Sequence, residues 1–246
     1  MWKKIILSII VILLITSGWL AYSINNEFIK LESDDPEVWE SVIKDFEIED
    51  KNTKHHEDAI LFIGSSSIRF WYSLQEDMAP LPVIKRGFGG AKLNDVSYYA
   101  DRVIFPYQPK KIVLFAGTND ISGRPNDKSP KKVLVDFKIL IGKIKAKLPN
   151  TTVYFLPITP TISRREIWPQ ANKANQLIKA FIKQEKNIIY IDTTKHFIDN
   201  EGNLNEDLIW FDGIHLSKKG YKVWTKLIKD QIVKNQYNGQ KQHIYQ

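Results

Sequence analysis

Two stretches at opposite ends of the chain carry the residue types that acyl transfer needs. The Ser-rich turn Gly64-Ser65-Ser66-Ser67 follows a short apolar run, and Asp212 lies three residues before His215. A serine hydroxyl becomes a useful nucleophile only when a nearby base takes its proton, and the base is usually an imidazole that a carboxylate holds in one tautomer. We therefore expect Ser66 as nucleophile, His215 as base and Asp212 as the residue that orients the imidazole.

Two further stretches offer N–H donors for the negative charge that develops on the ester carbonyl oxygen. Gly87-Phe88-Gly89-Gly90 and Gly117-Thr118-Asn119-Asp120 each follow an apolar run. A glycine N–H is open to close approach because no Cβ intrudes, so Gly90 is the expected backbone donor, with Gly89 as the alternative. Together with the Ser66 N–H and the Asn119 amide, it would form an oxyanion hole.

Each of these features has an ordinary structural explanation when it is taken alone. A Ser-rich turn often only caps a helix, and adjacent glycines often form a tight loop. An Asn after a strand often closes a turn on its own backbone. Ser65 and Ser67 also adjoin Ser66, which we favour because of its place after the strand end. The combination of all the stretches is what indicates an acyl-transfer site.

Other catalytic classes fit the sequence poorly. The Gly-x-Ser-x-Gly elbow of α/β-hydrolases fails because residue 68 is Ile68. A dinucleotide fingerprint starting at Gly87 would need glycine where the chain has Lys92. The sequence contains no Walker loop, no His-Glu-x-x-His motif and no Cys. We therefore expect neither a metal ion nor a cofactor.

Short apolar runs alternate with helical patterns through the middle of the chain. Such continuous runs are typical of strands buried on both faces, and the alternation predicts a parallel sheet with helices on both sides. The expected strands are residues 59–63, 83–85, 111–116, 152–156 and 188–192, and the expected long helices are 130–148, 170–186 and 218–233. Ser217 is the expected N-cap of the last helix. Sites in such sheets form at the carboxyl ends of the strands, where the Ser-rich and Gly-rich stretches lie.

The amino end is a predicted membrane segment. Residues 5–24 carry no charge and match the span of a bilayer core at ~1.5 Å per residue, and Lys3 and Lys4 precede them. The positive-inside bias places the rest of the chain outside the cytoplasm. The length of the run favours a retained signal anchor, whereas Ala21-Tyr22-Ser23 would suit cleavage of a signal peptide and secretion.

The chain divides into four segments by composition. Residues 1–26 form the signal anchor or signal peptide, 27–58 an acidic stalk with a short amphipathic helix, 59–235 the main domain, and 236–246 a polar tail. The net charge of +7 comes from two Lys-rich segments, 128–147 and 218–246. These are typical of solvated helix faces, with attraction to an anionic surface as the alternative. No nucleic-acid-binding motif accompanies them, so we expect no nucleic-acid partner.

Through these stretches the chain resembles the SGNH hydrolase family, also called GDSL esterases and lipases. The family is named for Ser, Gly, Asn and His in separate blocks, which match 64–66, 87–90, 117–120 and 212–215 here. The resemblance implies a flavodoxin-like three-layer α/β/α sandwich with a parallel five-stranded sheet. It also implies a serine esterase that works through an acyl-enzyme, with Ser66, Asp212 and His215 as catalytic residues. The implied oxyanion hole is Ser66, Gly90 and Asn119.

One departure bears on activity, because Ser65 stands where the family usually has Asp. A membrane-anchored binding module that kept the fold and lost turnover is therefore the alternative function. The resemblance leaves the substrate open among esters, and an exported enzyme would meet envelope lipids or acetylated carbohydrates. Residues near the expected site are Trp71, Phe88, Trp168, Arg164 and Arg165. The aromatic residues would line the cleft or pack in the core, and the arginines would bind an anion or lie in a solvated loop. Oligomeric state stays open.

Overall fold

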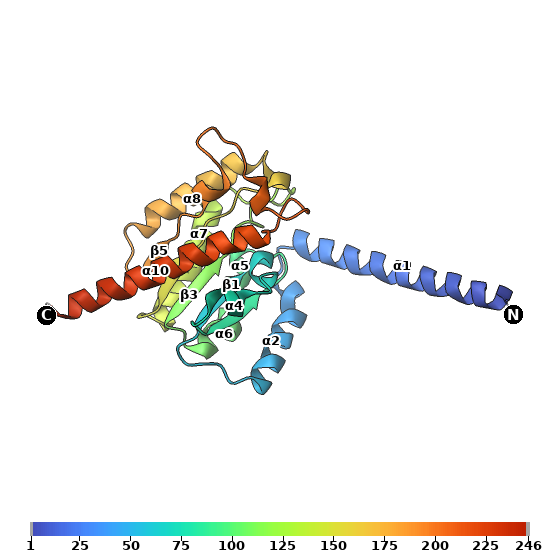
Figure 1. Cartoon of the computed structure of the whole chain (residues 1–246), viewed down its shortest axis with the longest axis horizontal. Helices are drawn as coiled ribbons and strands as arrows, with labels where there is room; N and C mark the ends of the chain where they lie inside the picture. Colours follow the sequence, from blue (N-terminus) through green and yellow to red (C-terminus); the bar gives the residue numbers. More distant parts are fainter. Residues whose placement is uncertain (1, 245–246) are drawn as a thin grey trace.

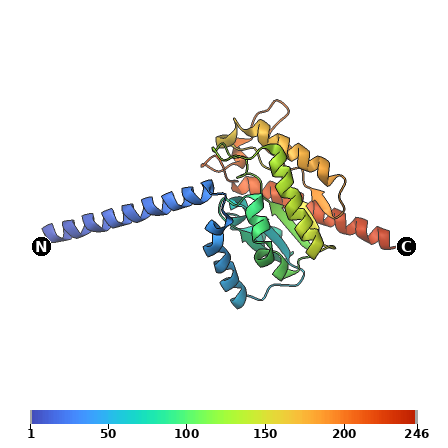
Figure 2. The same ribbon diagram turned by 180° about the vertical axis from the view of Figure 1, so that it is seen from behind.

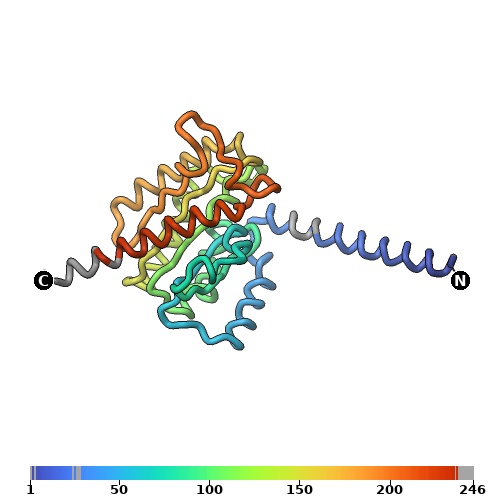
Figure 3. Tube along the Cα trace, in the orientation of Figure 1, coloured from blue at the N-terminus to red at the C-terminus, as the bar shows by residue number. Residues whose placement is uncertain are grey.

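Five parallel strands form the centre of the structure. The computed structural model describes residues 2–244 and, within them, all side chains except those of 3, 24, 26–28, 236 and 238–244 (Figure 3). The strands are β1 (Ile60–Gly64), β2 (Val83–Gly87), β3 (Lys111–Phe115), β4 (Thr152–Phe155) and β5 (Ile188–Tyr190). Their order in the sheet is β2-β1-β3-β4-β5, the flavodoxin-like order. The predicted α/β class and the five-stranded parallel sheet are confirmed.

The strands are buried on both faces, which explains their continuous apolar sequences. In β1, Leu61 and Ile63 belong to the core on one side of the sheet, and Ile60 and Phe62 belong to the core on the other. Gly64 at the end of β1 pairs with Gly87 of β2 and with Phe115 of β3. The three strands therefore end at one level, so the loops that follow them lie side by side.

Helices cover both faces and complete the three layers (Figures 1 and 2). One face is covered by α2 (Glu40–Asn52), α5 (Leu93–Tyr98), α6 (Ala100–Val103), α7 (Pro130–Lys147) and α8 (Trp168–Ile182). The other is covered by α3 (Ser66–Arg69), α4 (Leu74–Met78), α9 (Thr194–Phe197) and α10 (Lys218–Ile244).

Some helix ends differ from the expected bounds. Helix α8 begins at Trp168 rather than at residue 170, because Pro169 is tolerated in a first helical turn. It also ends at Ile182, before the polar residues that we had included. Helix α10 continues past residue 233 to Ile244, with no Pro to stop it. Its start is as expected, because the Ser217 hydroxyl accepts the N–H of Gly220 at 3.2 Å.

The first helix, α1 (Trp2–Glu32), projects away from the sandwich (Figure 1). By length and composition its stretch Lys4–Ser23 could span a membrane, and none of that stretch is buried. The helix extends beyond residues 1–26, the first segment defined by composition. It continues to Glu32, because no Gly or Pro interrupts residues 27–32.

The acidic segment that follows packs against the sandwich. A 3-10 turn (Pro36–Trp39) leads into α2, and the Asp35 carboxylate accepts the Glu37 N–H at its start. Trp39 is 2% exposed and Ile43 is fully buried. The Trp39 indole donates to the Asp95 carboxylate at 3.2 Å, so one polar bond adds to the apolar contact.

We expect Trp39→Ala to lower the free energy of unfolding by about 3–5 kcal/mol, because it empties a buried ring site. Chemical denaturation of the full chain in a neutral detergent measures this change. Ile48→Ala is the matched control, since Ile48 lies on the same helix and is 56% exposed. Ile48→Ala should shift the value by no more than about 0.5 kcal/mol. An equally small loss for Trp39→Ala would show that this segment is not docked in solution.

Candidate active site

Ser66 lies at the turn from β1 into α3, beside the end of β3. Gly64 makes this turn possible, because it has a φ of +143° and a Cβ there would lie 1.9 Å from the carbonyl oxygen of Phe115. The next residue, Ser65, donates its N–H to the same carbonyl at 3.0 Å. Ser66 is then the first residue of α3 and is half-buried. A tight glycine turn thus fixes where the Ser66 hydroxyl points.

The structure brings together three predicted residues that lie far apart in the sequence. The Ser66 hydroxyl is 2.8 Å from Nε2 of His215, and Nδ1 of His215 is 2.6 Å from the Asp212 carboxylate. With the Nδ1 proton facing Asp212, Nε2 is free to accept from the serine. A hydroxyl, an imidazole and a carboxylate joined in this order can activate the hydroxyl as a nucleophile.

The Asp212–His215 turn is held by its own backbone. One oxygen of Asp212 accepts the N–H groups of Ile214 and His215, both at 2.9 Å. Burial by itself would raise the pKa of Asp212, but the hydrogen bonds from His215 and from the two backbone N–H groups hold this pKa below its usual value. The carboxylate therefore stays charged at neutral pH beside the imidazole. On the other side of His215, the Phe70 ring packs edge-on at 4.8 Å between centroids.

Gly90 and Asn119 lie beside Ser66, as predicted. Both line a cavity of about 180 Å³ that Ser66 and His215 also line, which we call the Ser66 pocket. A Cβ on Gly90 would lie 3.8 Å from the amide nitrogen of Asn119. The alternative, Gly89, lines the pocket too, but the space where its Cβ would be is taken by the Trp39 ring, 2.0 Å away. The missing side chain of Gly90 is therefore the one that keeps Asn119 accessible.

Arg164 fixes the Asn119 amide. Its guanidinium donates to the Asn119 side-chain oxygen at 3.2 Å and to the carbonyl and hydroxyl of Thr118 at 2.6 and 2.9 Å. Because the amide oxygen is held by Arg164, the amide NH₂ must face the other way, where it also donates to the Ala91 carbonyl at 3.3 Å. The neighbouring Arg165 instead pairs with Glu206 at 3.2 Å on the surface. Only the first of the two arginines belongs to the site.

The three aromatic residues that could have lined the cleft pack in the cores instead. Trp71 and Phe88 are fully buried, on opposite sides of the sheet, and Trp168 is a partly buried residue against one core. A separate apolar cavity of about 500 Å³ adjoins the site and shares Phe70 and His215 with the Ser66 pocket. We call it the aromatic groove. Its other aromatic walls are Tyr72, Trp210 and Tyr221.

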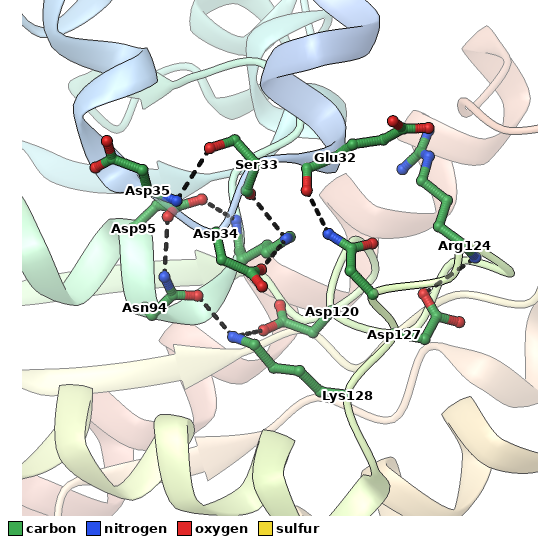
Figure 4. Close-up of polar contacts among 12 residues, drawn as sticks. Glu32, Ser33, Asp34, Asp35, Asn94, Asp95, Asp120, Arg124, Asp127 and Lys128 are labelled. Atoms are coloured by element: carbon green, nitrogen blue, oxygen red, sulfur yellow. Dashed lines mark hydrogen bonds and ion pairs between the residues drawn. The ribbon is translucent and has the colours of Figure 1, made fainter.

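Leu31 of α1 is a pocket residue that the sequence pattern did not reveal. It lines the Ser66 pocket, and a Cβ on Gly90 would lie 1.8 Å from its Cδ2. Figure 4 shows the polar contacts that hold Glu32, Ser33 and Asp34, which follow Leu31 in the sequence. The buried Lys92 ammonium donates to the Ser33 carbonyl at 2.9 Å and the Asp34 carboxylate at 2.6 Å. The Asn126 amide donates to the Glu32 carbonyl at 2.6 Å. The end of α1 thus forms part of the pocket wall.

Comparison with known proteins identifies the family and the fold of the chain. The model of the GDSL-like Lipase/Acylhydrolase family matches residues 64–223. The human platelet-activating factor acetylhydrolase IB subunit alpha2 is 25% identical over 186 residues, 73% of this chain and 78% of that protein. The structure of a GDSL-like lipase from Bacteroides thetaiotaomicron has a TM-score of 0.67 and 22% identity, covering 78% of this chain and 98% of that one. The structure of a platelet activating factor protein from Streptococcus pneumonia has a TM-score of 0.70 and 20% identity, covering 87% of this chain and 98% of that one.

The fold and the matched family define an ester-bond hydrolase. The chain belongs to the GDSL-like lipase/acylhydrolase family, as the resemblance to SGNH hydrolases predicted.

Substitution of Gly90 tests the contact with Leu31. Gly90→Ala should lower the free energy of unfolding of the full chain by about 1–3 kcal/mol, because the new methyl group overlaps Leu31. In a Leu31→Ala background, Gly90→Ala should lower the free energy of unfolding by at least about 0.5 kcal/mol less than it does in the unaltered chain. Independent, distant substitutions usually add to within roughly this amount, so a larger difference shows that the two residues interact. Gly142→Ala is the matched control, since a Cβ there meets nothing within 4 Å. Equal costs of Gly90→Ala in both backgrounds would contradict the docking of α1.

Proposed function

We propose that this chain is a serine esterase in which Ser66 attacks the carbonyl carbon of a carboxylic ester. The observation that carries the proposal is the chain of hydrogen bonds from Ser66 through His215 to Asp212, at 2.8 and 2.6 Å. As the bond from Ser66 to the carbonyl carbon forms, His215 Nε2 takes the serine proton, and the charged Asp212 stabilises the imidazolium. His215 then gives that proton to the leaving alcohol, which leaves an acyl-serine.

A water molecule completes the cycle. The oxygen of the water attacks the acyl carbon while His215 takes a proton from the water. His215 then gives this proton to Ser66 as the carboxylic acid leaves. In both halves the carbonyl oxygen carries negative charge for a moment. The Ser66 and Gly90 N–H groups and the Asn119 amide are the proposed donors to it. Arg164 supports this role of Asn119 because it binds the amide oxygen, which leaves the NH₂ group as the donor that Asn119 can offer.

The size of the Ser66 pocket supports a short acyl group. A cavity of about 150 Å³ is enough to hold benzene, so a pocket of about 180 Å³ suits an acetyl group better than a long acyl chain. The matched human relative is named an acetylhydrolase, which agrees with this choice. We therefore propose acetyl esters, of a lipid or a carbohydrate, as substrates. The aromatic groove on the other side of His215 is the proposed place for part of the alcohol.

We infer the location of the domain relative to a membrane from α1. Its stretch Lys4–Ser23 has the length and composition to cross a bilayer. Two lysines precede the apolar stretch, which supports a short cytoplasmic end and a domain outside the cytoplasm. Because Leu31 forms part of the pocket wall, we propose that the segment is retained as an anchor. The catalytically inactive binding module remains the alternative, motivated by Ser65 in place of the usual Asp.

A fluorophosphonate probe separates the esterase from the binding module. We expect the full chain to be labelled covalently and Ser66→Ala to lose the label, because only an activated serine reacts with the probe. Ser65→Ala is the matched control, since Ser65 is buried and its hydroxyl has no hydrogen-bond partner among the described residues. It should label like the unaltered chain. Failure of the unaltered chain to label, while it remains folded, would favour the binding module.

Acid should lower turnover if His215 acts as the base. The base must be neutral to take the Ser66 proton, so kcat/KM should fall as pH drops below neutrality. The lowered pKa of Asp212 keeps that carboxylate charged through this range, so Asp212 should add no ionisation of its own to the acid limb. A series of kcat/KM measurements from pH 5 to pH 9 on an acetyl ester checks this. A flat profile would rule out His215 as the base.

A further inference from the structure

The Ser66 pocket has an excess of positive charge. Three arginines line it, Arg69, Arg124 and Arg164, while no Asp or Glu is among its described lining residues. Arg69 is exposed, whereas Arg124 and Arg164 are partly buried, so the three extend from the mouth of the pocket toward Asn119. None of them forms an ion pair within the part of the chain that the structure describes. The charge is therefore directed at the space in front of Ser66.

This contrasts with how the rest of the chain treats its buried cations. Arg86 is 1% exposed and pairs with the carboxylates of Glu49 and Asp50. Lys92 is 2% exposed and pairs with Asp34 at 2.6 Å. Lys128 pairs with both Asp120 and Asp136 at 2.8 Å. A buried charge is costly unless it has a partner, and Arg86, Lys92 and Lys128 each have a carboxylate partner.

Arg164 has only neutral partners. Its bonds go to the carbonyl and hydroxyl of Thr118 and to the Asn119 amide oxygen, which use three of the five N–H donors of a guanidinium. Burial first, and then the nearby charge of Arg124, lower the pKa of Arg164 to about 10. An anion placed between the two guanidiniums would relieve both costs.

Two carboxylates near the pocket arginines, those of Asp127 and Glu32, form no ion pair with them among the described residues. Asp127 accepts the backbone N–H groups of Ser122, Gly123 and Arg124, and its charge acts on Arg164 without forming an ion pair among the described residues. The Glu32 side chain extends toward Arg124 in Figure 4 without forming an ion pair. The pocket arginines are thus left available to a ligand.

We propose that the substrate carries an oxyanion, a phosphate or a carboxylate, on the group next to the scissile ester, and that Arg69, Arg124 and Arg164 bind it. Guanidinium groups suit this task because their planar N–H pairs match two oxygens of a phosphate or carboxylate. Arg164 touches both the proposed anion and Asn119, so the anion lies within one side chain of the oxyanion hole. This rests on the proposed function, because it names the substrate class for the same Ser66 site.

Matched pairs of acetyl esters test the proposal by turnover. One pair is 1-acetylglycerol 3-phosphate with 1-acetylglycerol, and the other is 2-acetoxypropanoate with its amide. For the full chain in a neutral detergent at low salt, we expect kcat/KM to be at least tenfold higher for the anionic member of at least one pair. The pair with the larger ratio tells phosphate from carboxylate. A ratio near one in both pairs, with neutral esters still cleaved by Ser66, would overturn the anion subsite and leave the esterase standing.

Two variants assign the preference to the pocket. Arg124→Gln should reduce the anionic-to-neutral ratio at least tenfold, because it removes one of the guanidiniums. Arg165→Gln is the matched control, since Arg165 is the next residue after Arg164 but pairs with Glu206 outside the pocket. It should leave the ratio unchanged. An equal fall in both variants would assign the preference to general surface charge and overturn the proposal.

A binding measurement covers the case in which no ester is cleaved. Titration calorimetry of the Ser66→Ala chain with the same four esters should give a Kd at least tenfold lower for the anionic member of at least one pair. Added salt should weaken that difference, as screening of a charge contact requires. Equal Kd values within both pairs, or no binding of any member, would overturn the anion subsite whatever the fate of the esterase.

Discussion

The site depends on how closely β1 and β3 approach each other at their carboxyl ends. Gly64 lies so near the Phe115 carbonyl that no side chain fits between them, and the Ser65 N–H then bonds to that same oxygen. This contact ends β1 and turns the chain into α3, so the position of Ser66 is set by the sheet itself. Because β2 ends level with β1, the glycine loop after β2 lies against the same point. The hydroxyl of Ser66 and the glycine loop are therefore placed by the sheet, whereas His215 comes from the irregular segment before α10.

The sequence was most informative where one local pattern determined one element. Continuous apolar runs predicted the five strands, because a strand buried on both faces has no polar side. The Asp212–His215 turn was also readable, since three residues separate its members and both bonds within it are local. The meeting of His215 with Ser66, 149 residues apart, was foreseen from the blocks of the SGNH family rather than from spacing. Trp71 and Phe88 were ambiguous because aromatic residues near loops pack in cores as readily as in clefts.

Contacts between distant segments could not be foreseen in the same way. Leu31 follows a long apolar helix and carries no chemical signal, so only the docking of α1 reveals it as pocket wall. Arg124 lies in a polar loop in which the Asp127 carboxylate accepts the Arg124 backbone N–H. No sequence motif predicts this turn, so the position of Arg124 in the pocket could not be foreseen. The first segment, residues 1–26, was bounded by charge, and charge does not predict how far a helix continues. Glutamate is a good helix former, so the acidic residues that follow need not end α1.

The unbroken course of α1 also sets how the domain would sit above a bilayer. From Ser23 to Glu32 the helix adds only about 14 Å beyond the apolar stretch, at ~1.5 Å per residue. If Lys4–Ser23 spans a bilayer, a helix docked through Lys92 and Asn126 would hold the domain closer to the membrane than a flexible tether of equal length. The Ser66 pocket would then stay close to the membrane surface, and substrates farther away would have to diffuse toward it.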